Sequence, residues 1–195
     1  MKKLSTYFFL IFFSFSASSF ADDIKDFEIE GMTIGGSLLD YMSEEKIKEN
    51  EVSVYPEKFT ISVYKISTKI YDMGVGITYK SNDKTYKIHG VQGLIFFENN
   101  IEGCYKKQDE IEKEISSMFT ETKKNNWGIL TNPSSAEGST FKGITFVFNN
   151  GSRATIECYH YSDIPETDHL KITANSKELA KYLDYTTAQE RKTNN

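Results

Sequence analysis

Cys104 and Cys158 are the two residues of this 195-residue chain whose chemistry is easiest to predict from type and spacing. They are the only cysteines, and they lie too far apart in sequence for the Cys-x-x-Cys motif of redox enzymes. Two cysteines of an exported protein pair by default in an oxidising compartment. We therefore predict a disulfide between Cys104 and Cys158, with two buried free thiols as the alternative.

The histidines His89, His160 and His169 are the candidate general bases and metal ligands. To act together, two of them would have to meet acidic side chains such as Asp163 or Asp168 in the fold. The chain has no helical His-x-x-x-His pair, no zinc-ligand spacing, no serine nucleophile elbow and no phosphate-binding loop. The sequence therefore predicts no catalytic residue, no cofactor and no metal ligand.

The first 21 residues predict export. Lys2 and Lys3 precede an apolar run over 7–15, and small residues occupy the −3 and −1 positions of a cleavage site that ends at Ala21. This is the pattern of a secretory signal peptide over 1–21, and the apolar run is about half as long as a membrane-spanning helix requires. An uncleaved anchor is the alternative. Export predicts a periplasmic protein, with secretion as the second possibility.

The charge of the chain argues against two classes of partner. The formal net charge is −5, and removal of Lys2 and Lys3 with the signal peptide makes the mature protein more acidic. An acidic chain without a basic amphipathic stretch is repelled by nucleic acid and by anionic membrane surfaces. We therefore predict no nucleic-acid partner and no membrane span after signal cleavage, and leave an unknown protein or small-molecule ligand as the partner.

Hydrophobic periodicity predicts the elements that position the cysteines. Alternating apolar residues predict strands over 71–80 and 85–97. Apolar residues at steps of three and four predict a helix over 101–125, with Cys104 on its core-facing stripe. The next stretch, 128–140, is rich in Gly, Ser and Thr and contains a Pro, so it predicts a long loop that is a candidate binding segment.

A hairpin follows, and the parity of its apolar residues determines its register. Apolar residues occupy even positions over 144–148 and again over 154–158. A two-residue loop over 150–151 would mix the faces, whereas a three-residue loop over 149–151, with Gly151 in the left-handed conformation, keeps both sets on one face of the hairpin. This register directs Cys158 toward the core.

The C-terminal part predicts a short strand near 170–172 and a helix opened by Asn175. Together these elements predict an α+β fold, a mainly antiparallel sheet with helices packed on one face, in a single domain over 22–195. A helix followed by three strands is expected twice in succession. This order suggests a duplicated unit with a boundary near 98–101, although no residue-level repeat is present.

Two blocks carry a family resemblance: IEGMTIGGSLLDYMSEEKIKENE over 29–51 and NNIEGCYKKQDEIEKEI over 99–115. Through these blocks and the hairpin, the chain resembles uncharacterised exported proteins of low-GC marine alphaproteobacteria. That resemblance implies periplasmic residence and names no activity. The Gly31-Met32-Thr33 entry into short helices is more weakly similar to small outer-membrane assembly lipoproteins and to β-lactamase-inhibitor-like domains. This chain lacks the lipid-bearing cysteine of those lipoproteins, so the resemblance does not imply a membrane anchor.

Two functions are compatible with these observations. Export, a disulfide and the lack of a catalytic motif favour a non-enzymatic binding or interaction module that uses its surface. The alternative is a periplasmic hydrolase whose dispersed acidic residues, or His89 and His160, meet only in the folded chain. A cleft that holds two converging titratable groups would favour the hydrolase.

Overall fold

The structure is a computed structural model of the chain, and it describes residues 23–55, 58–64, 71 and 74–193. The predicted signal peptide over 1–21 lies outside the described residues. The helices are α1 (Glu44–Glu49), α2 (Ile101–Met118) and α3 (Lys177–Thr193), with single 3-10 turns η1 (Ile24–Asp26), η2 (Leu38–Asp40) and η3 (Pro165–Thr167). The strands are β1 (Glu28–Ile29), β2 (Met32–Thr33), β3 (Glu51–Tyr55), β4 (Phe59–Tyr64), β5 (Val75–Lys80), β6 (Gly90–Phe96), β7 (Lys123–Thr131), β8 (Thr140–Val147), β9 (Arg153–His160) and β10 (His169–Asn175).

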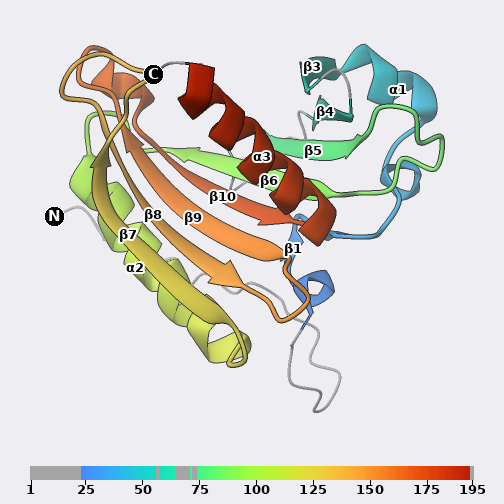
Figure 1. Cartoon of the computed structure of the whole chain (residues 1–195), viewed down its shortest axis with the longest axis horizontal. Coiled ribbons are helices and arrows are strands. Elements are labelled where there is room, and N and C mark those ends of the chain that lie inside the picture. Colours follow the sequence, from blue (N-terminus) through green and yellow to red (C-terminus); the bar gives the residue numbers. More distant parts are fainter. Residues whose placement is uncertain (1–22, 56–57, 65–70, 72–73, 194–195) are drawn as a thin grey trace, which may run out of the picture.

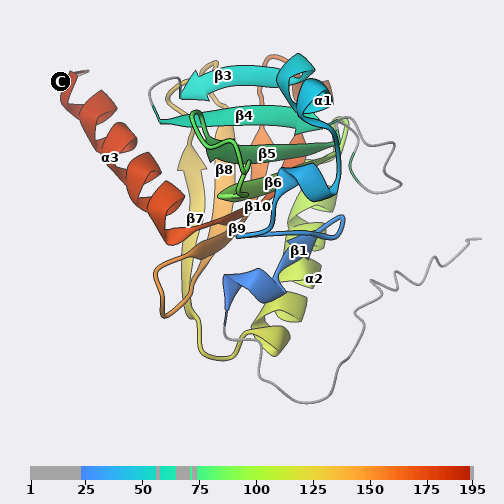
Figure 2. The ribbon, with the colours of Figure 1, turned by 90° about the vertical axis from the view of Figure 1, so that its right-hand side faces the viewer.

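Within the described residues, eight strands form one antiparallel sheet in the order β3-β4-β5-β6-β10-β9-β8-β7 (Figure 1). The first four and the last four are each a meander preceded by a helix, and the two meanders join where β6 pairs with β10. Strong twist makes β3, β4 and β5 run across the direction of β7, β8 and β9 (Figure 2). A helix followed by four strands therefore occurs twice, and α2 begins at Ile101, within the range 98–101 predicted as the boundary. A duplication of the unit itself stays a prediction.

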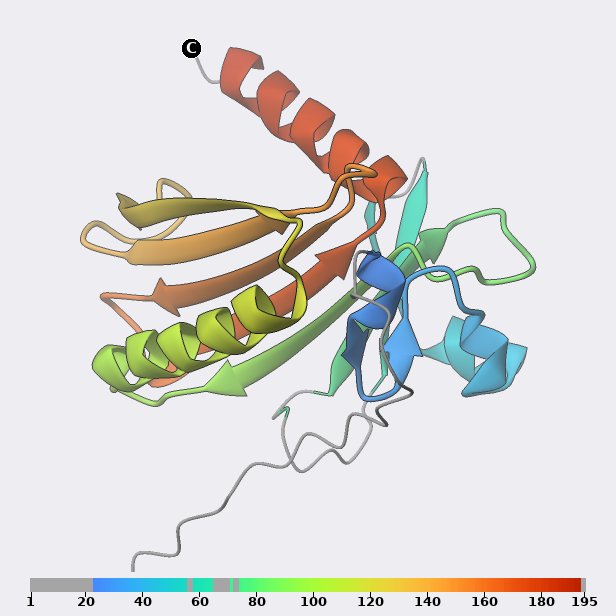
Figure 3. The same cartoon turned by 90° about the horizontal axis from the view of Figure 1, so that it is seen from below.

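The α+β class is confirmed, but the expectation that the helices pack on one face is wrong. On β9, Cys158 bonds to Cys104 of α2, whereas Arg153 forms an ion pair with Asp184 of α3. Residues an odd number apart in a strand point to opposite faces, so α2 and α3 lie on opposite sides of the sheet. Figure 3 shows this arrangement, with the sheet between the two helices. We call the two sides the α2 face and the α3 face.

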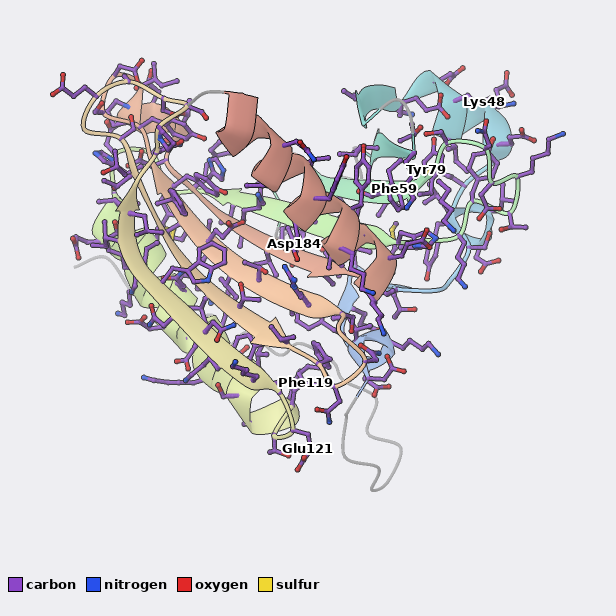
Figure 4. The ribbon with its side chains drawn as sticks, viewed as in Figure 1. Lys48, Phe59, Tyr79, Phe119, Glu121 and Asp184 are labelled. Atoms are coloured by element: carbon purple, nitrogen blue, oxygen red, sulfur yellow. A yellow bond between two sulfur atoms is a disulfide. The ribbon has the colours of Figure 1, made fainter. Side chains whose placement is uncertain are left out.

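The α2 face holds the larger part of the hydrophobic core. Asn100 caps α2, because its side chain accepts a hydrogen bond of 3.0 Å from the N–H of Gly103. The helix ends at Met118 rather than at 125, and Figure 4 shows the next residue, Phe119, at this end of α2. Phe119 is buried, and its ring contacts those of Phe27 and Phe148. The burial of Phe119 turns the chain back toward the sheet, which stops the helix earlier than its periodicity predicts.

The cysteine prediction agrees with the structure. The Cα atoms of Cys104 and Cys158 lie 6.0 Å apart, and the two sulfur atoms are at bonding distance. Both residues are fully buried between α2 and β9. The cross-link therefore fastens the helix to the middle of the second meander.

The hairpin register is also confirmed. The N–H of Phe148 donates to the carbonyl of Ser152 at 3.0 Å, and Phe146 lies opposite Ala154. Gly151 has a φ of 86°, the left-handed conformation that the three-residue loop requires.

The segment 128–140 differs from its prediction as a loop. Its first part belongs to β7, an edge strand that pairs with β8, and only 132–139 connects the two strands. The register shifts between Asn126 and Ile129, where Gly128 has a φ of 68°. This bulge interrupts the alternation that would reveal a strand, so the sequence pattern resembles a loop.

Candidate functional site

A cleft of about 370 Å³ lies on the α3 face, between the sheet and α3. Its lining comes from β4 through β10 and from α3, so all but the first strand of the sheet contribute to it. The side chains on this face form rows across the strands, because residues paired in register stand side by side. Three such groups define the chemistry of the cleft.

The first group, which we call the amide–hydroxyl row, consists of Gln92, Thr173, Thr155 and Thr145. Each residue pairs in register with the next on neighbouring strands, which lie about 4.8 Å apart. The hydroxyl oxygens of Thr145 and Thr155 are 3.3 Å apart, and the three threonines are buried. Threonine is β-branched and therefore favours a strand. Each threonine also places a hydroxyl on the sheet face beneath α3, where an apolar side chain would be expected.

The second group is an ion pair in the next row along the strands. The Nζ of Lys171 lies 3.1 Å from a carboxylate oxygen of Glu157 and donates to the hydroxyl of Tyr159 at 3.4 Å. Burial disfavours the charged ammonium, but Glu157 and Tyr159 outweigh it and raise the pKa of Lys171 above its ordinary value. Lys171 therefore stays ionised, and its ammonium lies against the carboxylate of Glu157 in the wall of the cleft.

The third group, the aromatic row, borders the cleft and consists of Phe96, His169, Tyr159 and Phe141. The ring of Tyr159 stacks on His169 at 5.1 Å and 22°, and on Phe141 at 5.9 Å and 21°. Burial, and then the charge of Glu157, raise the pKa of Tyr159 to about 12. Burial also lowers the pKa of His169. The row is thus a neutral stack of aromatic rings across neighbouring strands.

Two glycines make room for side chains that lie against the floor of the cleft. A Cβ on Gly143 would stand 2.3 Å from the ring of Trp127, and a Cβ on Gly76 would stand 2.8 Å from the side chain of Gln92. Both distances are too short for any side chain. The absence of a Cβ therefore lets Trp127 and Gln92 lie flat over the sheet.

Helix α3 forms the roof of the cleft. Its residues Leu179 and Ala180 are buried and line the cleft. Asp184, also in α3, lies in front of the sheet in the view of Figure 4. Both guanidinium Nη atoms of Arg153 donate to Asp184, at 2.8 and 2.5 Å. The Nε of Arg153 is buried without a hydrogen-bond partner in the described part of the chain. Arg153 therefore brings an unused donor to the cleft wall.

The structure separates the histidines that the sequence singled out. Nδ1 of His89 lies 3.0 Å from the hydroxyl of Ser176, just beyond the end of β10, and His89 is buried. His160 lies near the other end of β10, where its Nδ1 is 2.9 Å from Asp168. The length of this seven-residue strand keeps His89 and His160 apart, so they do not form a common site.

The pair of His160 and Asp168 is the one predicted acid–base contact that the fold brings together. Asp168 is buried, and its second oxygen accepts a hydrogen bond of 2.9 Å from the backbone N–H of Tyr161. His160 shares the strand parity of Cys158, so the pair faces the α2 side rather than the cleft. Asp163 is exposed. In the described ranges, no group of three or more His, Cys, Asp or Glu residues could hold a metal ion.

The cleft residues carry little signal in the sequence. Thr145 and Thr155 occupy the polar parity of the hairpin, which is typical of a solvent-facing strand surface. Thr173 joins them because β10 pairs with β9, and Gln92 joins Thr173 because β6 pairs with β10. The alternation of polar and apolar residues shows which residues of one strand share a face, but predicting the amide–hydroxyl row also requires the order of the strands in the sheet.

No family model matches the chain, and neither a curated protein nor a solved structure matches it. Of the helices in the described ranges, none has the length and apolar character needed to cross a membrane.

Proposed function

We propose that the protein is a non-enzymatic, exported binding module and that the cleft on the α3 face is its ligand site. The observation that carries this proposal is the gathering of polar side chains under α3. Gln92, Glu157 and Lys171 line a space of about 370 Å³ instead of an apolar interface. Helix α3 would pack more tightly on an apolar sheet face, so the polar lining suggests a selected role in binding.

The placement of the ionisable groups favours binding over catalysis. Glu157 and Lys171 are engaged with each other, at 3.1 Å. A general acid or base needs a free position from which to reach the substrate. The export part of the proposal is supported by the N-terminal sequence pattern and by the cysteine pair, which suits an oxidising compartment.

A periplasmic hydrolase is the second candidate, and the contact between His160 and Asp168 favours it. A carboxylate that holds Nδ1 of a histidine leaves Nε2 to act as a base. On this view, His160→Ala would abolish turnover and a variant of the cleft would not. The binding module is thus sensitive to a change in the cleft, whereas the hydrolase is sensitive to the loss of His160.

The test compares two variants with the parent protein. Gln92→Trp places a ring over Gly76, as Trp127 lies over Gly143, and so fills the cleft. Thr131→Trp introduces the same side chain at an exposed position of the edge strand β7. Native mass spectrometry then records what each protein retains from the exported fraction of the source cells, and thermal melting confirms that all three are folded.

The proposal expects ligand retention by the parent and by Thr131→Trp, and its loss in Gln92→Trp. Equal retention by the three proteins would place binding outside the cleft and overturn the proposal. Turnover of a retained compound that His160→Ala abolishes would establish the hydrolase instead.

A further inference from the structure

We propose that the cleft binds a neutral saccharide, with a pyranose ring lying on Trp127, beside the aromatic row, and its hydroxyl groups directed toward the amide–hydroxyl row. This inference rests on the proposed function, because it takes the cleft to be the ligand site and names the class of ligand.

The charges in the cleft wall favour a neutral ligand. Lys171 is paired with Glu157 at 3.1 Å, and Arg153 is held by Asp184 through two hydrogen bonds. An anionic ligand would have to displace one of these carboxylates, and a cationic ligand would have to displace a lysine or an arginine. For Lys171 and Glu157, whose side chains are the more buried of the two pairs, displacement would leave a charge without its partner in the cleft wall, which is costly. A ligand without charge avoids this cost.

The amide–hydroxyl row matches the hydrogen-bonding character of a sugar. A threonine hydroxyl and a glutamine amide each donate and accept, and so does every hydroxyl of a saccharide. Thr155, Thr173 and Gln92 present such groups on adjacent strands, at a repeat of about 4.8 Å. The buried Nε of Arg153 adds a donor that lacks an acceptor among the described residues. A ligand oxygen would satisfy this donor.

The aromatic row supplies the apolar surface that a sugar ring requires. One face of a pyranose exposes mainly C–H groups, which are buried favourably against the negative face of an aromatic ring. Tyr159 stacks on His169 at 22° and on Phe141 at 21°, so these rings cover one another's faces and form an apolar rim beside the cleft; all three are half-buried. The ring of Trp127 lies over Gly143 in the cleft and meets Phe141 edge-on, at 6.2 Å between centroids, so Trp127 offers the ring face on which a pyranose can lie.

The size of the cleft agrees with a short oligosaccharide. About 370 Å³ lies within the range of roughly 300–1,000 Å³ that small-molecule sites occupy. A folded protein partner would need about 800 Å² of open surface on this side, whereas α3 already covers part of the face.

The single tryptophan makes the experiment direct, because Trp127 lines the cleft and is the only Trp in the chain. Its emission is recorded while the purified, oxidised protein is titrated with maltotriose and with the β-1,4-linked trimer of N-acetylglucosamine. Trigalacturonic acid supplies an anionic sugar of similar size, and triglycine amide supplies a cationic peptide.

The proposal expects a saturable change in Trp127 emission with at least one neutral trisaccharide, and with neither charged probe. Tyr159→Ala should weaken that binding by about tenfold or more, because it removes the ring that stacks between His169 and Phe141 at the centre of the aromatic row. Gln92→Ala should weaken saccharide binding as well. This variant replaces Tyr159→Ala in the test if thermal melting shows that Tyr159→Ala is unfolded. Tyr185→Ala is the matched control, because Tyr185 is 62% exposed and does not line the cleft.

Three results would overturn the saccharide inference. These are no saturable change with either neutral trisaccharide up to about 10 mM, tighter binding of a charged probe, or equal affinity in the parent and in both cleft variants. Any of them, together with ligand retention that Gln92→Trp abolishes, would leave the cleft as a binding site for another class of ligand. If the saccharides do not bind and Gln92→Trp also leaves ligand retention unchanged, the proposed function is overturned too.

Discussion

Breaking the Cys104–Cys158 disulfide tests the packing of α2 on the sheet. The bridge closes a loop of 54 residues, and both cysteines are fully buried. For a loop of this length, the chain-entropy model gives a stabilisation of about 4 kcal/mol at 25 °C, because the cross-link restricts the unfolded chain. Domains of this kind have unfolding free energies of about 5–15 kcal/mol in total. Loss of the bridge should therefore remove a large part of the stability.

Urea unfolding measures this difference directly. The oxidised parent, the reduced parent and the double variant Cys104→Ala/Cys158→Ala are compared under the same conditions. With a denaturant dependence of about 2 kcal/mol per molar urea, a loss of 4 kcal/mol lowers the midpoint by about 2 M. Reductant should lower the midpoint of the parent and leave that of the double variant unchanged. The reduced parent is the more informative sample, since it loses the cross-link without losing an atom of the core.

A difference below about 1 kcal/mol between the oxidised and reduced parent would refute this reasoning. So would two free thiols in the oxidised protein by mass spectrometry. In either case the cysteines would not fasten α2 to β9, and the proposed arrangement of the core would lose its covalent support.

Three further predictions concern the α3 face and its surroundings. Gly143→Ala should displace the ring of Trp127 and shift its emission to longer wavelength, because the new Cβ would lie 2.3 Å from that ring; an unchanged spectrum would contradict the contact. Burial lowers the pKa of His89, so the unfolded chain binds this proton more readily and stability should fall as the pH drops below about 6.5. His89→Gln should reduce the fall in melting temperature between pH 7 and pH 5, and an identical fall would count against burial as its cause. Asp184→Asn should cost less than about 1 kcal/mol, since its ion pair with Arg153 is partly exposed, yet hydrogen exchange in α3 should become faster; unchanged exchange would show that the pair does not hold the helix.

The amino-acid sequence alone predicts those features that depend on near neighbours in the chain. The helical period places Cys104 on the inner stripe of α2, and strand parity places Cys158 on the inner side of the hairpin. The left-handed Gly151 follows from the same local rule, because a three-residue loop keeps the apolar residues together and a two-residue loop does not. The inward direction of both cysteines and the hairpin register were therefore predictable from short segments, whereas the 6.0 Å between the cysteine Cα atoms depends on the packing of α2 on β9.

Only the tertiary structure decides which face each helix covers and which strands are neighbours. An apolar stripe on a helix shows that it packs, but the stripe is the same whichever side of the sheet it meets. The bulge at Gly128 hides β7, because it breaks the alternation on which strand prediction depends.

The cleft is the clearest case of a feature that local pattern does not determine. The polar parity of β8 and β9 is typical of a solvent-facing surface, and nothing near Thr145 or Thr155 in the sequence indicates that α3 lies above them. Gln92 and Thr173 are far apart in the chain, and they join the same row only through the pairing of β6 with β10. The row exists because two meanders meet edge to edge, and that meeting depends on the free energy of the whole core rather than on any single segment.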